Sequence, residues 1–437
     1  MRVRAEINDS RWFGDVPDGW SMVPLPRLFS SSKGMTVTKA DLVDAGAPVV
    51  NYAQVHSKEN NKFGVSDGLI KHVPEDFVPE GLRKSTQGSF IFACTSEDLA
   101  GCGDCIYNDS EQMLNPGGDT LLLTPISEVD NKYFAYLFST DMWRWQIRRD
   151  LVDVKVFHVN QGNLHETYAI VPPRSEQRQI VSYLDERCVA IDDDVAKRRE
   201  VIGKLKEYKK SLIAHAVTKG LDPNADMKDS GVEWIGRIPG NWTAARTKSC
   251  LHFSRSKKPE NREVQVLSLY REYGVIPKLS RDDNHNRTSE DTSDYKHVHP
   301  GDLVVNKMKA WQGSLGLSDY EGIVSPAYFV YSPNENTINR RYLHYLVRSS
   351  LYAQRWNALS YGIREGQWDL HREDFESNYL ILPPMSTQCS IADYLDERCA
   401  AIDEAITRQE QLIDKLGEYR KSIIHHAVTG KIDCTEG

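Results

Sequence analysis

The segment Tyr183-Leu-Asp-Glu-Arg-Cys188 occurs a second time as Tyr394-Leu-Asp-Glu-Arg-Cys399 in this chain of 437 residues. The same offset of 211 residues carries His215-Ala-Val-Thr218 onto His426-Ala-Val-Thr429. Two matches at one offset indicate that a long segment is present twice. The structure that the first copy adopts is therefore expected again in the second.

A second pair of matching stretches opens the two halves of the chain. Trp12-Phe-Gly14 recurs as Trp234-Ile-Gly236, and Trp20 recurs as Trp242, at an offset of 222. Because the offset falls from 222 to 211 further along, the interior of the first half is longer by 11 residues. Halves that share their ends and differ between them predict one frame that holds two different recognition surfaces.

The composition is that of a large globular protein. With 437 residues, of which 40% are hydrophobic, the chain can bury two cores of ordinary size. The first residues lack the apolar stretch of a secretory signal and no membrane span is evident, so we expect a cytoplasmic protein. The net charge of −8 means that any affinity for nucleic acid would come from local basic patches.

The repeated segment has the signals of a long helix. Pro172-Pro173 ends the preceding element, and Ser175 then offers a hydroxyl N-cap. Pro383-Pro384 and Ser386 repeat this signal in the second copy. At the other ends, Gly220 and Gly430 are the expected C-caps.

Apolar residues follow at spacings of three and four, which is a heptad seam. The seam residues are Leu184, Cys188, Ile191, Val195, Ile202, Leu205, Leu212 and Ala216 in the first copy and Leu395, Cys399, Ile402, Ile406, Ile413, Leu416, Ile423 and Ala427 in the second. Polar interruptions also match, with Arg198 equivalent to Gln409 and Lys209 equivalent to Arg420. An ordinary surface helix accounts for a short amphipathic stretch, but seams of this length favour two helices that pair as a coiled coil.

The linker after the first helix predicts the orientation of the pair. Only the short stretch Lys219-Gly-Leu-Asp-Pro-Asn224 leads from this helix into the second variable region. That region should lie near the end of the first helix, and the second helix must start there and run back. We therefore expect antiparallel helices with one globular domain at each end.

The two variable regions mix apolar runs with Gly, Pro and Asn turns, which is typical of α+β domains. Residues 301–306 predict a turn and a buried strand, and 340–347 a helix with an apolar face; residues 89–93 and 132–138 are the corresponding pieces of the first half. The expected fold is α+β, with two globular domains separated by a pair of long antiparallel coiled-coil helices in a pseudo-two-fold internal repeat. The expected divisions are a first domain at 1–171, a helix at 172–220, a second domain at 221–382, a helix at 383–430 and a tail at 431–437.

Basic and aromatic residues interleave at three places. They are Asn306-Lys-Met-Lys-Ala-Trp311, Arg255-Ser-Lys-Lys258 and Trp143-Arg-Trp-Gln-Ile-Arg-Arg149. Lysine and arginine can hold phosphates, while Asn, Gln and Arg can form bidentate contacts with base edges. The alternative for the third stretch is that Trp143 and Trp145 belong to a core and the arginines only face water.

Motifs for catalysis are missing from the sequence. There is no Gly-x-x-x-x-Gly-Lys phosphate loop, and Asn115-Pro-Gly-Gly118 is not the Asn/Asp-Pro-Pro-aromatic loop of amino-methyltransferases. Asp141 with Asp153-Val-Lys155 matches a nuclease pattern only loosely. Cys102-Gly-Asp-Cys105 with Cys94 lacks the second spaced pair of a zinc site. We therefore expect no catalytic residues and no metal in this chain.

The whole chain resembles the specificity (S) subunit of type I restriction–modification systems. The residues that carry the resemblance are Trp234-Ile-Gly-Arg-Ile-Pro-Gly-Asn-Trp242, Asn306-Lys-Met-Lys-Ala-Trp311, Ser325-Pro-Ala-Tyr328 and Pro172-Pro-Arg-Ser-Glu-Gln177. The match covers nearly the full length, and the tandem arrangement is more specific than any one motif. The second helix departs from the pattern at Ser386-Thr-Gln388, where the family usually has Glu before Gln, and the first domain lacks the Asn-Lys-x-Lys-x-x-Trp string.

The resemblance implies a subunit that performs no chemistry and binds no cofactor. Its two target-recognition domains would each read one half of a split DNA target, while the helices set the gap and dock the partners. Two modification subunits would bind S-adenosylmethionine and methylate adenine, and restriction subunits would use ATP and Mg²⁺ to translocate and cut DNA. The alternatives from other classes are a coiled-coil scaffold that binds only proteins and a stand-alone DNA-modifying enzyme.

The resemblance and the basic stretches together predict DNA-contact residues in both domains. In the second domain they are Asn306, Lys307, Lys309 and Trp311, with Arg364 and Gln367 in the loop 361–368. In the first domain they are Gln161, Asn163 and His165, in what we take as the stretch corresponding to that loop, together with Arg148 and Arg149.

Overall fold

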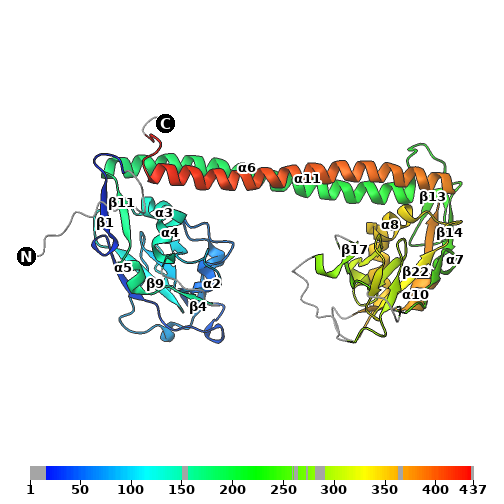
Figure 1. Cartoon of the computed structure of the whole chain (residues 1–437), viewed down its shortest axis with the longest axis horizontal. Helices are drawn as coiled ribbons and strands as arrows, with labels where there is room; N and C mark the ends of the chain where they lie inside the picture. Colours follow the sequence, from blue (N-terminus) through cyan, green and yellow to red (C-terminus); the bar gives the residue numbers. More distant parts are fainter. Residues whose placement is uncertain are drawn as a thin grey trace, which may run out of the picture. The chain divides into compact units, whose positions relative to one another are not determined.

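The chain folds into two compact units (Figure 1). The computed structural model describes residues 16–149, 156–257, 259, 264–271, 274–280, 291–362 and 368–434, so Trp12-Phe-Gly14 lies outside the described residues. The first unit comprises Met1–Lys197 with Gln411–Gly437, and the second comprises Arg198–Glu410. The division falls inside the two long helices, at neither 171 nor 382, because half of each helix packs into the core of each unit.

The first unit is built on a four-stranded antiparallel sheet of order β2-β9-β5-β7. Its strands are β2 Phe29–Lys33, β9 Thr120–Pro125, β5 Phe90–Ala93 and β7 Cys105–Tyr107. The helices α3 Asn131–Ser139 and α4 Asp141–Arg148 follow β9 in the chain. Strand β5 and helix α3 confirm the strand expected at 89–93 and the helix expected at 132–138.

An aromatic core joins this sheet to its helices. Phe90 and Phe138 are fully buried, with ring centroids 5.0 Å apart in an edge-to-face arrangement. Trp143 of α4 is also fully buried, and its ring centroid lies 4.3 Å from that of Phe138. Aromatic pairs of this kind contribute about 0.5–1.5 kcal/mol beyond the area that they bury.

The second unit repeats the sheet order as β15-β22-β19-β20, again antiparallel. Its strands are β15 Leu251–Phe253, β22 Tyr328–Pro333, β19 Leu303–Asn306 and β20 Leu315–Leu317. Helices α8 Arg340–Arg348 and α9 Ser350–Leu359 follow β22 as α3 and α4 follow β9. The strand expected within 301–306 and the helix expected at 340–347 are confirmed, and the two halves share one topology.

Shorter elements complete each unit. In the first they are β1 Ser21–Pro24, η1 Leu25–Arg27, η2 Lys39–Asp41, β3 Ala47–Val50, α2 Tyr52–Val55, η3 Asp67–Leu69, β4 Lys71–Val73, η4 Glu75–Phe77, β6 Thr95–Ser96, β8 Asn115–Pro116, β10 Phe157–His158, α5 Gln161–His165 and β11 Tyr168–Val171. In the second they are β12 Met227–Asp229, β13 Arg237–Pro239, β14 Thr243–Arg246, α7 Thr247–Cys250, β16 Leu267–Tyr270, β17 Gly274–Pro277, η5 Lys278–Ser280, β18 Lys296–Val298, η6 Ala310–Gln312, β21 Gly322–Val324, β23 Ser360–Tyr361, β24 Asp369–Leu370, α10 Arg372–Ser377 and β25 Tyr379–Leu382. Strand β1 pairs with β11, and β14 pairs with β25, so each variable region closes on itself just before its long helix begins.

The long helices are α6 Arg174–Lys219 and α11 Met385–Val428. The prediction that Ser175 and Ser386 are N-caps is wrong by one or two residues, because both lie inside the first turn. The helices instead begin directly after the proline pairs, where the Gln177 amide donates to the Pro173 carbonyl at 3.0 Å. At the other ends, Gly220 and Gly430 have φ of 83° and 69°, which confirms both glycine C-caps.

Within each unit the two helices pair in the antiparallel sense. In the second unit Arg198 donates to Gln409 at 3.0 Å and Lys209 binds Asp403 at 2.6 Å, so residue numbers rise along one helix as they fall along the other. In the first unit Arg420 binds Asp192 at 2.6 Å. The offset of 211 that relates Lys209 to Arg420 also relates Asp192 to Asp403, so the two ion pairs are equivalent by the internal repeat. The pairing expected from the matching interruptions is therefore confirmed.

The predicted seam is buried most deeply where a variable region packs over it. Leu184 and Leu395 are fully buried, each in the core of its unit. The other seam residues that are less than one-tenth exposed are Cys188, Ile191, Ala216, Cys399, Ile402, Ile406, Ile423 and Ala427. Val195, Ile202, Leu205, Leu212, Ile413 and Leu416 are half-buried. The seam residues toward the middle of the helix pair are thus less buried than those under a variable region.

Two buried tyrosines, one in each unit, tie each variable region to the end of a helix, and sequence reasoning did not single them out. The hydroxyl of Tyr133 in α3 is shared between the carbonyls of Ile170 and Val428, at 3.1 and 3.3 Å. Tyr342 in α8 makes the equivalent bonds to Ile381 and Val217, at 3.1 and 3.3 Å. The last carbonyls of a helix have no partner within it, so a buried hydroxyl satisfies them.

The repeated glutamines hold the entry to each helix. Gln177 is 2% exposed; its amide donates to the Pro172 carbonyl and its oxygen accepts from the Asp130 amide, both at 2.8 Å. Gln388 makes the matching bonds to Pro383 and Asn339, at 2.9 and 2.8 Å. One side chain thereby joins the start of the long helix to the start of α3 or α8. None of the helices in the described part of the chain is long and apolar enough to cross a membrane.

Candidate nucleic-acid interface

A tight turn after β19 presents the basic residues predicted to contact DNA. Asn306, the last residue of β19, is only 6% exposed, and its side-chain oxygen accepts from the Met308 amide at 3.2 Å. Its carbonyl accepts from the Lys309 amide at 3.1 Å. Asn306 therefore shapes the turn, and contact of its side chain with DNA stays a prediction.

The turn leaves its two lysines accessible. Lys309 is exposed, next to Met308, which is 55% exposed. Lys307 is 35% exposed, and its ammonium lies 3.4 Å from the Asp369 carboxylate. A pair this open to water contributes little to stability, and the lysine can exchange that carboxylate for a phosphate. The geometry thus leaves both lysines able to reach a polyanion.

Aromatic residues surround this turn. Trp311 donates its indole N–H to the Met308 carbonyl at 3.1 Å, and its ring lies 5.2 Å from that of Trp368. Tyr361, 57% exposed, stacks on His371 with centroids 4.5 Å apart. Lys307, Tyr361 and His371 line an open cavity of about 450 Å³ that also holds Asp369, Glu373 and Asp374. Trp368 and His371 were missed as site residues, although the first closes the loop that the sequence singled out.

The residues predicted in the first domain do not occupy the place expected of them. The offset of 211 carries α5 Gln161–His165 onto α10 Arg372–Ser377, and both helices precede the strand that closes the variable region. The counterpart of the loop 361–368 therefore falls near 150–157. Most of that stretch lies outside the described residues, as do Arg364 and Gln367 of the second domain.

The three predicted side chains of α5 make bonds within the domain. Gln161 donates to Ser31 of β2 at 2.9 Å, and His165 lies 2.7 Å from the same hydroxyl. The Asn163 side chain accepts from the Asn160 amide at 2.8 Å and so caps the helix. Gln161 and Asn163 are half-buried and His165 is exposed. A role for them in DNA contact stays a prediction.

The two predicted arginines of α4 differ in burial. Arg148 is 7% exposed and binds Asp141 at 2.9 Å and the Ala100 carbonyl at 2.6 Å. Its guanidinium holds a loop from inside the domain, and DNA contact by this side chain stays a prediction. Arg149 is 37% exposed beside Glu166 and can still face a phosphate. The core alternative holds for Trp143, whereas Trp145 is 51% exposed.

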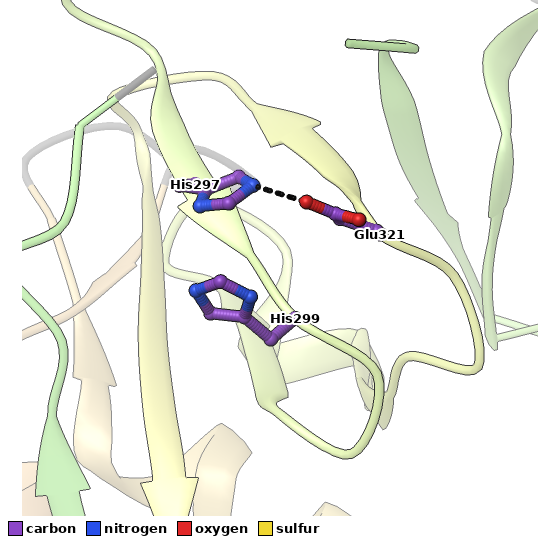
Figure 2. Close-up of side chains that lie close together, drawn as sticks. All are labelled: His297, His299 and Glu321. Atoms are coloured by element: carbon purple, nitrogen blue, oxygen red, sulfur yellow. Dashed lines mark ion pairs between the residues drawn. The ribbon is translucent and has the colours of Figure 1, made fainter. Parts of the chain in front are cut away.

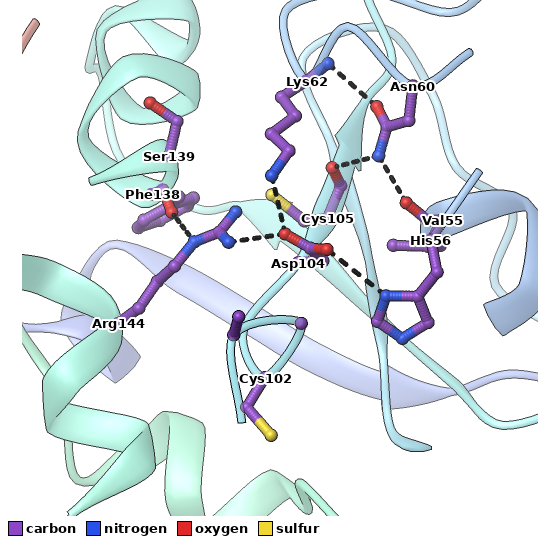
Figure 3. Close-up of polar contacts among 12 residues, drawn as sticks. Val55, His56, Asn60, Lys62, Cys102, Asp104, Cys105, Phe138, Ser139 and Arg144 are labelled. Carbon is purple, nitrogen blue, oxygen red and sulfur yellow. Dashed lines mark hydrogen bonds and ion pairs between the residues drawn. The ribbon is translucent and has the colours of Figure 1, made fainter. Parts of the chain in front are cut away.

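The sheet topology identifies a loop of the first domain that sequence reasoning did not propose. Strand β5 stands where β19 stands, so the loop 94–104 between β5 and β7 is the counterpart of the lysine turn between β19 and β20. At its end, Asp104 lies within 2.5–3.3 Å of Arg144, Lys62 and His56 (Figure 3). Lys62 and His56 are 35% and 24% exposed. Two partly exposed basic side chains therefore border this loop, each paired with Asp104.

The cysteines of this loop are held in the thiol form. Cys102 and Cys105 are buried. Burial raises the pKa of Cys105 to about 12 and also raises the pKa of Cys102, so both thiols carry a proton near neutral pH. Asp153-Val-Lys155, the loose nuclease match with Asp141, lies outside the described residues. What organises the loop is the carboxylate of Asp104.

Replacing Asp104 with Asn is expected to destabilise the first unit by about 3–5 kcal/mol, because it leaves the buried Arg144 without a counter-charge. Burial raises the pKa of Asp104, but the His56 hydrogen bond and the charges of Arg144 and Lys62 outweigh it and hold that pKa well below its usual range. The stabilisation is thus present above about pH 4 and is lost as pH falls through the lowered pKa. The hydrogen bond to Asp104 raises the pKa of His56. The stability that protonated His56 contributes is therefore complete below about pH 6.5 and is lost above the raised pKa.

Hydrogen exchange in β5 and β7 measures this prediction locally. The difference in opening free energy between wild type and Asp104→Asn should be largest between about pH 4 and 6.5 and should shrink on further acidification. Asp44→Asn, at an exposed position of the same unit, is the control and should leave exchange unchanged. A difference that stays constant down to low pH would show that the charge of Asp104 is not what holds the loop.

Comparison with known proteins identifies a family and several relatives that this chain matches. The family described as "Type I restriction modification DNA specificity domain" matches residues 17–191 and again residues 252–414. The chain is 20% identical to the type I restriction enzyme StySPI specificity subunit of Salmonella potsdam, across 96% of this chain and 90% of that relative. It is also 20% identical to the EcoKI specificity subunit of Escherichia coli (strain K12), with the same coverage of 96% and 90%.

Solved structures share the fold. A chain from a study of assembly and conformational transition in the type I R-M system aligns with a TM-score of 0.68 at 14% identity, covering 96% of this chain and 100% of that one. The HsdS subunit of Thermoanaerobacter tengcongensis aligns with a TM-score of 0.52 at 15% identity, covering 97% and 100%. The two family matches fall in the two halves that repeat one topology and together cover most of the chain. This chain therefore belongs to the type I restriction–modification DNA specificity family.

Proposed function

We propose that this chain is the DNA-specificity subunit of a type I restriction–modification complex and that each variable region reads one half of a bipartite double-stranded target. The observation that carries this proposal is the presence of two copies of the DNA specificity domain with different loops at one topological position. The second copy places Lys307 and Lys309 there, and the first places the loop 94–104. Different loops on one frame suit the reading of different half-sites.

We further propose that the paired helices dock two modification subunits and set the spacer between the half-sites. Tyr208 and Tyr419 occupy equivalent positions of the repeat and are 57% and 51% exposed on α6 and α11. Large exposed aromatic side chains are typical of interfaces. Two equivalent exposed positions suit two copies of one partner, which supports a pair of modification subunits.

The chemistry would reside in the partners. The modification subunits would bind S-adenosylmethionine, and restriction subunits would use ATP and Mg²⁺, while this chain binds none of them and contributes no catalytic residue. The lack of methyltransferase and phosphate-loop motifs in the sequence supports this division. A complex of this kind would act in the cytoplasm, where the free thiols of the chain would stay reduced.

A binding experiment with the modification subunits present tests the proposal. Substituting Lys309 with Ala should weaken binding to the methylated site, and the slope of log affinity against log salt should fall by about one, because one phosphate contact is lost. Lys228→Ala removes an exposed lysine from β12 of the same unit and is the matched control. An unchanged affinity and slope for Lys309→Ala would remove the turn from the DNA interface. An assembled complex that shows no sequence-specific binding would favour the scaffold alternative.

A further inference from the structure

Two histidines and a glutamate meet on neighbouring strands of the second unit (Figure 2). His297 and His299 are two residues apart along β18 and its continuation, so their side chains leave the same face. Strand β18 pairs antiparallel with β21, with Val298 opposite Gly322. Continuing this register by one residue sets Glu321 across from His299. The pairing of two strands therefore gathers three possible metal ligands.

The distances within this cluster suit a shared ion. Nε2 of His297 lies 3.2 Å from a Glu321 carboxylate oxygen, and one ligand atom from each of the three residues lies within 4.8 Å of the others. Two ligands at about 2.0–2.1 Å from a tetrahedral zinc ion lie about 3.3 Å apart. The pair formed by His297 and Glu321 already has that spacing, and a ligand atom of His299 lies within 4.8 Å of both.

The buried nitrogen of His297 gives a second, independent indication. The His297 side chain is 8% exposed, and its Nε2 has no hydrogen-bond partner among the described residues. Its 3.2 Å approach to Glu321 lacks the alignment of a hydrogen bond, so that contact leaves the nitrogen without a hydrogen-bond partner. A buried polar atom without a partner is costly, and a metal ion bound to this nitrogen would give it one.

We propose that His297, His299 and Glu321 bind a divalent transition-metal ion and that the ion is Zn²⁺. Two imidazoles and one carboxylate form a ligand set that zinc uses, with a fourth position left for water. The expectation of a chain without metal considered cysteine pairs and overlooked this His-x-His on a strand. The proposal is independent of the function proposed above, because it rests only on side chains within the second unit.

An ion pair of protonated His297 with Glu321 is the competing explanation. It satisfies two of the three side chains but leaves His299, whose ring lies 4.2 Å from that of His297, without a role. Two imidazoles this close would repel each other if both carried protons, whereas a metal ion uses both in the neutral form. The neighbouring cation Lys296 is engaged elsewhere, because its ammonium donates to the Tyr328 carbonyl.

The ion would cross-link a small part of the second domain close to its lysine turn. Strands β18 and β21 form a sheet of only two strands, and pairs of this size are marginal by themselves. Lys296 of β18 donates to the Tyr328 carbonyl, and Tyr328 stands opposite Asn306 of β19, the residue before Lys307. Metal binding would therefore fix a strand next to the residues that we propose face DNA.

Metal titration of the full chain tests the site. After treatment with a chelator and dialysis, the chain should bind one equivalent of Co²⁺ with the visible absorption of a tetrahedral or five-coordinate site, and Zn²⁺ should displace it. His297→Gln, His299→Gln and Glu321→Gln should each raise the Zn²⁺ dissociation constant by more than about 100-fold, since even outer-shell partners contribute about 10–100-fold. His252→Gln, on the exposed face of β15, is the matched control and should bind as the wild type does.

A stability measurement shows whether the variants are folded. Without metal, each variant should unfold at a temperature close to that of the wild type, and Zn²⁺ should raise the midpoint of the wild type and of His252→Gln only. Failure of the wild type to bind Co²⁺ or Zn²⁺ would overturn the proposal. A His299→Gln variant that binds Zn²⁺ as tightly as the wild type would also overturn it. The ion would then be bound without His299, and the cluster would be only the His297–Glu321 ion pair.

Discussion

Exchange of residues 21–171 for the corresponding region of another specificity subunit is expected to change one half of the methylated DNA site and to leave the other half unchanged. Strands β1 and β11 form a closed antiparallel pair, so junctions just outside them move a complete domain. Two altered base pairs in a half-site already cost about 2–6 kcal/mol, which is on the order of 30-fold or more in discrimination. Preference for the original site should therefore fall by at least that factor.

The donor region has to reproduce the contacts that hold the domain on the helices. It needs a tyrosine in the place of Tyr133, which bonds to the Val428 carbonyl, and an N-cap in the place of Asp130, whose amide donates to Gln177. Trp20 stays with the frame, because its indole donates to Glu176 of α6 at 2.7 Å. Donors that supply the first two of these contacts should give folded chimaeras.

Mapping of methylated adenines in cells that express the chimaera with its partner subunits measures the result. The reciprocal exchange of residues 243–382, bounded by the pair β14–β25, is the matched control and should change the opposite half-site. New preferences in both half-sites after a single exchange would show that the domains do not read DNA independently.

Insertion of one heptad into each long helix, after Arg198 in α6 and after Gln409 in α11, is expected to lengthen the spacer of the methylated site by about three base pairs. Seven residues preserve the seam and add about 10 Å at about 1.5 Å per residue. That length corresponds to about three base pairs of duplex. The insertion points lie at the boundary between the two compact units, so neither variable region loses its helical support.

Three added base pairs also rotate the groove by about 100°. The double insertion should therefore bind the longer site more weakly than the wild type binds the original site. A heptad placed in α6 alone is the control, because the ion pairs Lys209–Asp403 and Arg420–Asp192 can then no longer both form, and assembly should be reduced. Methylation rates on sites that differ only in spacer length measure the outcome. Wild-type methylation of the original site by the double insertion would show that the helices do not set the gap.

The helices and their pairing could be predicted because the information is local and repeated. A heptad seam specifies a helix and its buried face without reference to the rest of the chain. The offset of 211 also brought the interruptions Arg198 and Gln409 into correspondence, and these two side chains are hydrogen-bonded at 3.0 Å. The helix starts were misjudged by one or two residues, since a serine after two prolines resembles an N-cap while the prolines themselves already allow the first turn.

The candidate site was predicted only in part, because burial depends on distant segments. Arg148 and Arg149 are neighbours in the sequence, yet the first lies inside the domain against a loop from residues 100–102 and the second faces solvent. Asn306 and Lys309 stand in one short motif, yet only the lysine reaches the surface. A basic stretch shows that a surface can bind phosphate, but the contacts across the domain decide which side chains are left to do so.

Repetition and periodicity predict a tandem repeat with two α+β domains and two long paired helices, because both are properties of the chain itself. The fold was needed to identify which loops are equivalent, since matching β5 with β19 required the order of strands in each sheet. It alone brought Glu321 beside His297 and His299, across more than 20 intervening residues, through the register of β18 with β21. The physical reason is that helical periodicity arises from neighbours in the chain, whereas a site arises from strand pairing and burial between segments that the sequence keeps apart.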